Sequence, residues 1–515
     1  MPASKRVATF ARFAGGDSGV VAPLRAPDGT YSGVDAVVYA DGNVGPRCGL
    51  AEIGGTGIPA GDLTGIGYYS LSGSAVPDAW FAVGTAVYKQ PATPTALTSA
   101  LAVTPTKMLA AVPVGAGVYA ANYGDKTYRF TSTAVTAVAS SPGGLCAVLF
   151  GERLLVANTA ANPNRVFYTD PLAADGSGAT FTALGYFDVG RGAAIVGMWV
   201  IRNLVYIALD DGTWWVFTGV PGETDVLRLA YSGQSAPSGP AAGAVVGANN
   251  VWFVARDEHF PSYFNGSTVN TFDDQSTLGR LYAEDASNTQ LPGVTVIPIS
   301  RRGDMLCLAG AGLTGADRVS LLLREERWSR HSVFPPVAVP TPGGDGLVLM
   351  SDGGGGNAPR FFLWRATGFD RPADGTANQP TADAGLTAVE AEFDLPEFTL
   401  AASRTSTGNE EMQVATVTVD VRVYDVDASL GRSFASLTCE VQATRRREGQ
   451  PPKVSKPHGL AVDVTKGTAE GTPYRHRFRV GEQGLGAGWV IRFRNIKGMA
   501  VEQVKVEFEE QGATA

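Results

Sequence analysis

The chain has 515 residues and a formal net charge of −8, with 17% charged residues, 44% hydrophobic residues and 64 glycines. The hydrophobic content excludes an intrinsically disordered chain, and the mild negative charge argues against a dedicated nucleic-acid-binding protein. Many glycines among few charges are typical of short strands joined by turns, so we expect an all-β protein large enough for more than one domain.

The N-terminal region, residues 1–65, is rich in turn-forming residues and is expected to form an arm. Its candidate strand, Val34–Tyr39, is expected to close a ring by pairing with a distant blade, because closure removes two exposed sheet edges. No apolar run approaches the ~18 residues that span a membrane, and the first ten residues lack the apolar run of a signal peptide. We therefore expect synthesis in a cytoplasm and no membrane insertion.

Residues 66–372 repeat one hairpin motif, an apolar strand followed by a polar turn and a second strand. Examples are Trp80–Tyr88, Val148–Val156 and Val245–Phe253. Steps of 31 to 55 residues separate successive markers of the motif, which are Tyr88, Tyr119, Val156, Tyr206, Trp252, Cys307 and Phe362. A hairpin cannot bury its apolar face alone, whereas radially stacked hairpins can. The repeat predicts a β-propeller of six to seven blades.

The C-terminal part has a different pattern. Residues 373–385 are poor in large apolar side chains and are predicted to be a linker. In residues 386–515, segments such as Val417–Tyr424, Tyr474–Val480 and Val504–Glu509 alternate apolar and polar residues. This period of two places alternate side chains on opposite faces of a strand, so the pattern predicts a C-terminal β-sandwich.

The four cysteines and the four histidines are widely separated in sequence. Metal and redox motifs need close spacings, so Cys48, Cys146, Cys307 and Cys439 are interpreted as free thiols in or near cores. His259, His331, His458 and His476 likewise show no metal-ligand spacing. We therefore expect no enzyme, no catalytic residues, no bound metal and no cofactor.

Three short motifs admit a functional interpretation as well as a structural one. Gly16–Gly19 reads Gly-Asp-Ser-Gly, like a serine-protease nucleophile loop, but no His and Asp partners accompany it. Asp210–Gly212 and Asp352–Gly353 could supply calcium ligands, although Asp-Gly is also common turn chemistry. The turn interpretation is the one that we adopt.

One basic segment stands out near the C-terminus. It consists of Arg445, Arg446, Arg447, Lys453 and Lys456 in a stretch rich in Gly and Pro. The pattern predicts an exposed loop between two strands. Two interpretations remain open, a solvated loop or a contact with an acidic partner subunit or nucleic acid.

Four segments together resemble a family of bacteriophage β-propeller virion proteins. Ser32–Leu50 is similar to the opening of these chains, Phe150–Pro171 to a middle blade, Leu323–Trp328 to a later blade, and Gly488–Phe508 to the closing sandwich. The resemblance is spread over most of the chain.

The resemblance implies a structural role in the tail of a short-tailed phage. Members of the family, called nozzle or stabilisation proteins, form a ring of roughly six copies around the DNA channel below the portal and adaptor. For this chain it implies a non-enzymatic virion protein that helps to retain and deliver the genome, anchors tail fibres and contacts passing DNA without sequence specificity.

Two other functions are compatible with a propeller. A receptor- or glycan-binding propeller would line a concave site with Trp214, Trp215 and Trp252. A propeller glycosidase or lyase would need paired carboxylates ~5–9 Å apart at the propeller axis.

Overall fold

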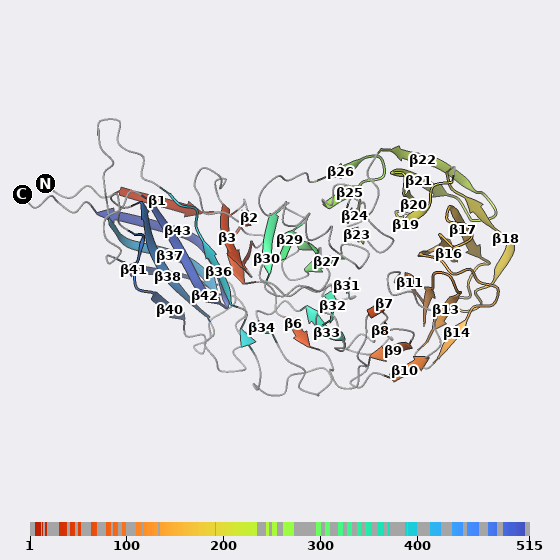
Figure 1. The fold of residues 1–515 in the computed structure, drawn as a ribbon, viewed down its shortest axis with the longest axis horizontal. Coiled ribbons are helices and arrows are strands. Elements are labelled where there is room, and N and C mark those ends of the chain that lie inside the picture. Colours follow the sequence, from red (N-terminus) through yellow and green to blue (C-terminus); the bar gives the residue numbers. More distant parts are fainter. Residues whose placement is uncertain are drawn as a thin grey trace, which may run out of the picture.

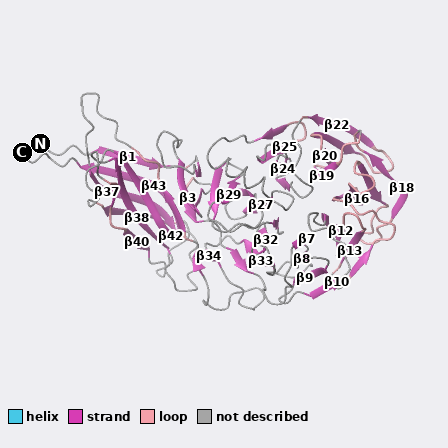
Figure 2. Cartoon of the chain, viewed as in Figure 1, coloured by secondary structure: helices cyan, strands magenta, loops and turns pink. Residues whose placement is uncertain are grey.

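A computed structural model describes the chain in segments, and every structural statement below refers to them. They are residues 6–11, 13, 16–17, 30–34, 36–38, 42–46, 50–52, 63–68, 79–83, 86–90, 95–98, 110–115, 117–131, 134–190, 192–233, 244–246, 250–254, 261–271, 295–299, 304–308, 318–322, 327–331, 337–340, 346–351, 359–364, 369–370, 387–388, 390–398, 413–423, 435–445, 451–462, 472–480 and 488–509. Their regular elements are all β-strands (Figures 1 and 2). Within these segments, no helix is long and apolar enough to span a membrane.

Seven four-stranded antiparallel sheets form the blades of a propeller. The first three blades contain β7 (Leu63–Tyr68), β8 (Ala79–Val83), β9 (Ala86–Gln90) and β10 (Thr95–Thr98); β11 (Ala110–Val114), β12 (Gly117–Ala121), β13 (Thr127–Phe130) and β14 (Val135–Ala137); and β15 (Cys146–Phe150), β16 (Arg153–Ala157), β17 (Arg165–Thr169) and β18 (Phe181–Asp188). The next two contain β19 (Ile195–Ile201), β20 (Leu204–Leu209), β21 (Thr213–Thr218) and β22 (Val226–Ser232); and β23 (Ala244–Val246), β24 (Asn250–Val254), β25 (Pro261–Phe264) and β26 (Val269–Thr271). The last two contain β27 (Thr295–Ile299), β28 (Asp304–Leu308), β29 (Arg318–Leu322) and β30 (Arg327–His331); and β31 (Val337–Pro340), β32 (Gly346–Ser351), β33 (Pro359–Trp364) and β6 (Leu50–Glu52).

The blades form a closed ring through their first strands. β7, β11, β15, β19, β23, β27 and β31 follow one another, and β31 lies next to β7. Radial repetition of this kind leaves only short, protected sheet edges. The predicted propeller of six to seven blades is confirmed, with seven blades.

The ring is closed by β6, which pairs with β33 through Glu52 opposite Phe362 and Leu50 opposite Trp364. The prediction that Val34–Tyr39 closes the ring is wrong. Instead, β3 (Thr30–Val34) pairs with β36 (Ala391–Asp394), and β4 (Ala36–Val38) pairs with β5 (Val44–Pro46). Alternation identifies a strand but not its partner, and β6 is the strand nearest in sequence to the first blade.

Two further sheets combine strands from both ends of the chain (Figure 1). The six-stranded sheet contains β4, β5, β1 (Arg6–Ala11), β43 (Met499–Glu509), β37 (Gln413–Val423) and β41 (Pro473–Arg479). The seven-stranded sheet contains β3, β36, β2 (Gly16–Asp17), β42 (Gly488–Lys497), β38 (Ala435–Arg445), β39 (Lys453–Val454) and β40 (His458–Val462). We call this unit the two-sheet domain.

The propeller is therefore an insertion in the two-sheet domain. β1 pairs with β43 along its whole length, from Arg6 opposite Phe508 to Ala11 opposite Gln503. The predicted arm of residues 1–65 is divided between the two units, because β1 to β5 join the two-sheet domain and β6 joins the propeller. β30 lies beside β2, β3 and β4, where the two units meet.

The two sheets share one hydrophobic core. The predicted alternation in β37 is confirmed, since Val417, Val419, Val421 and Val423 are fully buried. Trp489 of one sheet contacts Phe508 of the other, with ring centroids 4.9 Å apart. Two sheets that share a core are the arrangement expected of a β-sandwich. The assignment of this domain to the β-sandwich class stays a prediction.

The predicted linker, residues 373–385, lies outside the described residues. It falls between β34 (Phe369–Asp370) and β35 (Thr387–Ala388), which pair with each other in a two-stranded sheet.

Candidate partner interface

The outer face of the six-stranded sheet carries a row of arginines on β41, its edge strand. Arg475, Arg477 and Arg479 are exposed, whereas Phe478 is buried in the shared core. Successive side chains of a strand point to opposite faces, so residues two apart share a face at ~6.7 Å intervals. We call these three residues the arginine row.

Register places each arginine in a row that runs across the sheet. Arg475 lies opposite Asp420, and Arg477 lies opposite Thr418 of β37. Arg479 lies opposite Thr416, which in turn lies opposite Glu507 of β43. Cross-strand neighbours on one face are close enough to interact, so the pairing of β37 with β41 and β43 determines which charges meet.

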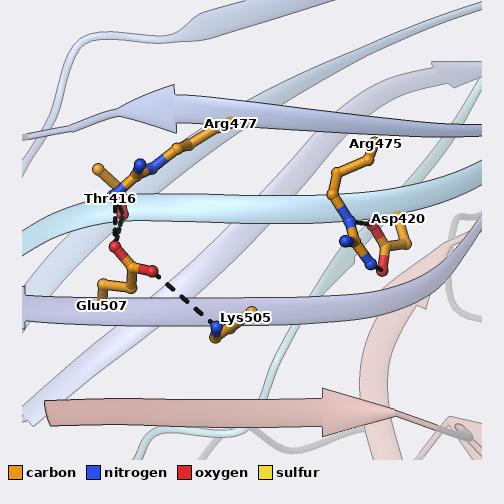
Figure 3. Close-up of polar contacts among 6 residues, drawn as sticks. All are labelled: Thr416, Asp420, Arg475, Arg477, Lys505 and Glu507. Atoms are coloured by element: carbon orange, nitrogen blue, oxygen red, sulfur yellow. Dashed lines mark hydrogen bonds and ion pairs between the residues drawn. The ribbon is translucent and has the colours of Figure 1, made fainter.

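The first ion pair of the row is bidentate (Figure 3). The Arg475 Nε and Nη2 atoms donate to the two carboxylate oxygens of Asp420 at 2.6 and 2.8 Å. The hydrogen bond and charge of Asp420 raise the pKa of the Arg475 guanidinium. This geometry fixes the plane of an otherwise flexible side chain.

The second ion pair is diagonal and has additional donors (Figure 3). Glu507 Oε2 accepts from Arg477 Nη2 at 2.5 Å and from Thr416 Oγ1 at 3.0 Å. Lys505 Nζ lies 4.0 Å from the other oxygen of Glu507. Glu507 is thus surrounded by two cations and a hydroxyl group.

The arginines project further into solvent than the carboxylates that hold them. The Arg475 and Arg477 side chains are 74% and 54% exposed, whereas those of Asp420 and Glu507 are 20% and 21% exposed. Arg479 has no ion pair with any residue that the structure describes. The surface that a partner meets is therefore guanidinium, a group suited to carboxylates and phosphates.

The sequence-predicted basic segment is partly described. Arg445 ends β38 opposite Gly488, Lys453 begins β39 opposite Ala443, and Lys456 is exposed beyond it. The structure describes the backbone of Arg445, and Arg446 and Arg447 lie outside the described residues. Arg445 and Lys453 belong to β38 and β39, which pair with each other in the seven-stranded sheet, so only the stretch between them can be the predicted loop.

The arginine row and the basic segment lie at the same end of the two-sheet domain. The contact between Trp489 and Phe508 aligns the start of β42 with the end of β43. Arg445 pairs beside Trp489, and Arg479 lies in the row of Glu507 beside Phe508. Sequence analysis recognised Tyr474–Val480 as a strand but missed the arginine row, although its i, i+2 spacing is a visible signal.

Of the three tryptophans that a glycan-binding site would use, the structure excludes Trp214 from such a surface. Trp214 is fully buried and stacks on Phe264 and Trp199, with centroids 4.3 and 5.5 Å apart. Trp215 is only partly buried, and its indole Nε1 is covered. The Trp252 side chain lies outside the description. The expectation that these tryptophans line one site is wrong for Trp214.

The Asp210–Gly212 segment is a turn. Asp210 Oδ1 accepts from the Ala194 amide at 2.8 Å, and Asp211 Oδ1 accepts from the Thr213 amide at 2.9 Å. Gly212 adopts a φ of +82°, which suits glycine. Asp352 and Gly353, as well as Ser18 and Gly19 of the protease-like motif, lie outside the described residues.

Cys146 and Cys439 are buried free thiols, as predicted. Cys48 and His259, and the side chains of Cys307 and His331, lie outside the description. His458 and His476 flank Phe478, at ring centroid distances of 6.5 and 4.6 Å. In the part of the chain that the structure describes, no three His, Cys, Asp or Glu side chains are grouped to hold a metal ion.

The closed ring of seven four-stranded sheets defines the chain as a β-propeller protein, with a two-sheet domain attached. No protein-family model and no curated protein matches the sequence.

Solved structures with similar folds include three propeller-sized chains. BamB from Moraxella catarrhalis has 15% identity and a TM-score of 0.37 over 65% of this chain and 94% of its own. BBS1N, solved in complex with ARL6DN, has 9% identity and a TM-score of 0.42 over 62% and 98%. The WD40 β-propeller domain of Doa1 has 9% identity and a TM-score of 0.38 over 61% and 97%. At these values the likenesses carry no argument about function.

Proposed function

We propose that the chain is a non-enzymatic structural protein of a phage virion, a subunit of a tail or head-to-tail ring around the DNA channel. In this role it extends the conduit, helps to retain and deliver the genome and offers a base for tail fibres. The sequence resemblance motivates the phage assignment, and a rigid docking surface on the two-sheet domain supports an assembly role.

The observation that carries the proposal is the arginine row. Two of its guanidinium groups are held in place by carboxylates on neighbouring strands, so little side-chain entropy remains to be lost on binding. Isolated exposed ion pairs stabilise a fold by only ~0–1 kcal/mol. A network that presents aligned arginines is therefore better explained by a partner of negative charge than by stability alone.

The topology also suits a load-bearing subunit. The propeller is joined to the two-sheet domain through both of its ends, and β30 packs against β2, β3 and β4. Two connections and a packed junction restrict hinge motion more than a single linker does. A component of a conduit needs this restriction.

A propeller glycosidase or lyase would place two carboxylates at the axis. The seven first strands of the blades, from β7 to β31, contain no Asp or Glu in their described ranges. Such an enzyme would have to draw both carboxylates from residues outside these described first strands.

The test is the assembly state of the purified full chain, measured by sedimentation velocity and native mass spectrometry at two salt concentrations. A discrete ring species is expected. Replacing Arg445, Arg446 and Arg447 with Ser should leave the unfolding midpoint unchanged and weaken assembly, with the larger loss at low salt, where the charge contacts of the parent are screened least. The matched control replaces Lys126, Arg202 and Arg228, three exposed propeller cations, with Ser.

A chain that stays monomeric at all concentrations, and is missing from purified particles by peptide mass spectrometry, would contradict the proposal. Receptor binding would then be the leading function, to be tested by glycan-array binding of the same protein.

A further inference from the structure

A second charged surface lies on the propeller, at the connections that follow the third strands of blades three and four. The β17–β18 connection carries Asp170 and Asp175, and the β21–β22 connection carries Glu223 and Asp225. All four carboxylates are exposed. We call these four residues the acidic connections.

Arg153 joins the two connections. Its Nη1 donates to the Thr169 carbonyl at 2.9 Å, and its Nη2 donates to Glu223 of the next blade at 3.1 Å. The Arg153 side chain is only 9% exposed, whereas Glu223 is 63% and Asp170 is 58% exposed. The Arg153 cation is buried beneath Asp170 and Glu223, so these two carboxylates face outward, whereas Arg129 of blade two lies beside Asp175 and donates to its carbonyl at 3.4 Å.

Apolar side chains accompany these charges. Val220 and Val226, in and directly after the β21–β22 connection, are 38% and 52% exposed. Leu184, at an irregular part of β18, is 85% exposed. Exposed apolar side chains next to a charged rim are typical of protein interfaces.

The acidic connections and the arginine row cannot meet within one molecule. β41 lies at one end of the long axis, and β17, β18 and β22 lie at the other (Figure 1). Each surface is nevertheless complementary to the other in charge. A contact between two different surfaces of identical chains repeats, and it builds a closed ring or an open filament.

We propose that the arginine row of one copy docks on the acidic connections of the next copy. This inference rests on the proposed ring function and names the surfaces that form it. Arg479 supplies the free guanidinium, while Arg475 and Arg477 remain held by Asp420 and Glu507. Asp170 is the carboxylate with the loosest internal contact, 4.0 Å from Arg153.

The experiment is a charge swap in the full chain, read out by sedimentation velocity. Arg479→Glu alone and Asp170→Lys alone should each weaken association at least about tenfold, because each creates a like-charge contact. The double variant, with both changes in one chain, should recover assembly. Thermal melts of all three variants verify folding, and Arg202→Glu serves as a control with the same charge change at an exposed site.

Mixing the two single variants gives a second readout. Every contact between unlike chains then pairs opposite charges, either Arg479 with Asp170 or the introduced Glu with the introduced Lys, so mixed assemblies should form although neither single variant assembles well alone. If Asp170→Lys unfolds the chain, Asp170→Asn with Asp225→Asn replaces it, since Asn retains the acceptor oxygen for the Gly222 amide.

The outcomes separate the inference from the proposed function. A parent chain that never assembles contradicts both. A parent that assembles, with variants that assemble equally well, overturns only this interface. If Arg479→Glu assembles normally but loses binding to a duplex DNA probe, the arginine row is a nucleic-acid contact and the inference is wrong.

Discussion

The hydroxyl group of Tyr119 in blade two donates a hydrogen bond of 2.7 Å to the carbonyl of Gly176 in blade three. Both groups are buried, and burial raises the pKa of the Tyr119 phenol. Gly176 has a φ of +74°, a conformation that suits glycine. Two other glycines also lie close to a tyrosine hydroxyl of the preceding blade. A Cβ atom on Gly222 would lie 2.8 Å from the hydroxyl of Tyr168, and one on Gly266 would lie 2.9 Å from that of Tyr206. Tyrosine-to-glycine contacts thus connect blades two to five.

Tyr119→Phe should destabilise the fold by ~1–2 kcal/mol, because it leaves the Gly176 carbonyl buried without its donor. Thermal and urea unfolding of the parent and the variant measure the change. Tyr128→Phe is the control, since its hydroxyl bonds to Asp125 three residues away and joins no blades. Equal losses of stability in the two variants would show that the hydrogen bond between blades stabilises the fold no more than a hydrogen bond within one blade does.

Arg153→Met should destabilise by ~1–3 kcal/mol, because the Thr169 carbonyl and the Glu223 carboxylate both lose a charged donor. Arg228→Met, on an exposed outer strand, should change stability by less than ~0.5 kcal/mol. A double-mutant cycle with Glu223→Gln isolates the pair. Additive effects in that cycle would mean that Arg153 and Glu223 are not coupled.

Burial raises the pKa of the Cys146 thiol from 9.0 to about 12, and it also raises that of Cys439. A raised folded pKa contributes stability that is complete below pH 9 and is lost as pH rises toward 12. Each of these thiols should therefore lower the free energy of unfolding by up to ~1.4 kcal/mol per pH unit in that window. The slope should be smaller in Cys146→Ala, which still contains the tyrosines that titrate in the same range. Equal slopes from urea unfolding at several pH values would contradict this prediction.

The same burial predicts slow chemical modification. Iodoacetamide at pH 8 should label Cys146 and Cys439 only after denaturation, because the reactive thiolate is disfavoured and covered. Peptide mass spectrometry resolves each cysteine separately. Rapid labelling of Cys146 in the native protein would show that its blade opens locally.

Removal of N-terminal strands should affect the two-sheet domain and the propeller separately, depending on where the truncated chain starts. A chain that starts at Arg47 keeps β6 but lacks β1 to β5, so the edges of β43 and β36 lose their partners while the ring stays closed. A chain that starts at Gly54 also loses β6 and opens the seventh blade. Hydrogen exchange should therefore increase in β37–β43 for the first variant, and in both units for the second. Unchanged protection in β31–β33 after removal of β6 would contradict its closing role.

Removal of the chain after Gly385 should not act as the clean deletion of one independent domain, because the two-sheet domain also contains strands from the N-terminal part of the chain. β1, β3 and β5 would remain without β43 and β36, and exposed strand edges promote aggregation. A chain of residues 47–385 removes both parts of the two-sheet domain together and should be the more soluble. Static light scattering during a thermal ramp compares the two.

The sequence alone determined the features that depend on neighbours along the chain. A hairpin such as β15–β16 is specified by its apolar strands and its turn at Gly151, with a φ of +56°, so the repeat and the class of fold could be predicted. The alternation in β37 likewise identified its buried face, because side chains of a strand alternate strictly.

Only the tertiary structure decided which distant strands and charges come together. Alternation in Val34–Tyr39 could not distinguish a blade edge from the two-sheet domain, because an unpaired strand edge accepts any partner of suitable register. Pairing of β37 with β41 and β43 then placed Asp420 beside Arg475 and Glu507 beside Arg477, residues 55 and 30 positions apart in the chain. Residues so far apart are brought together by long-range strand pairing, which a local sequence pattern does not encode.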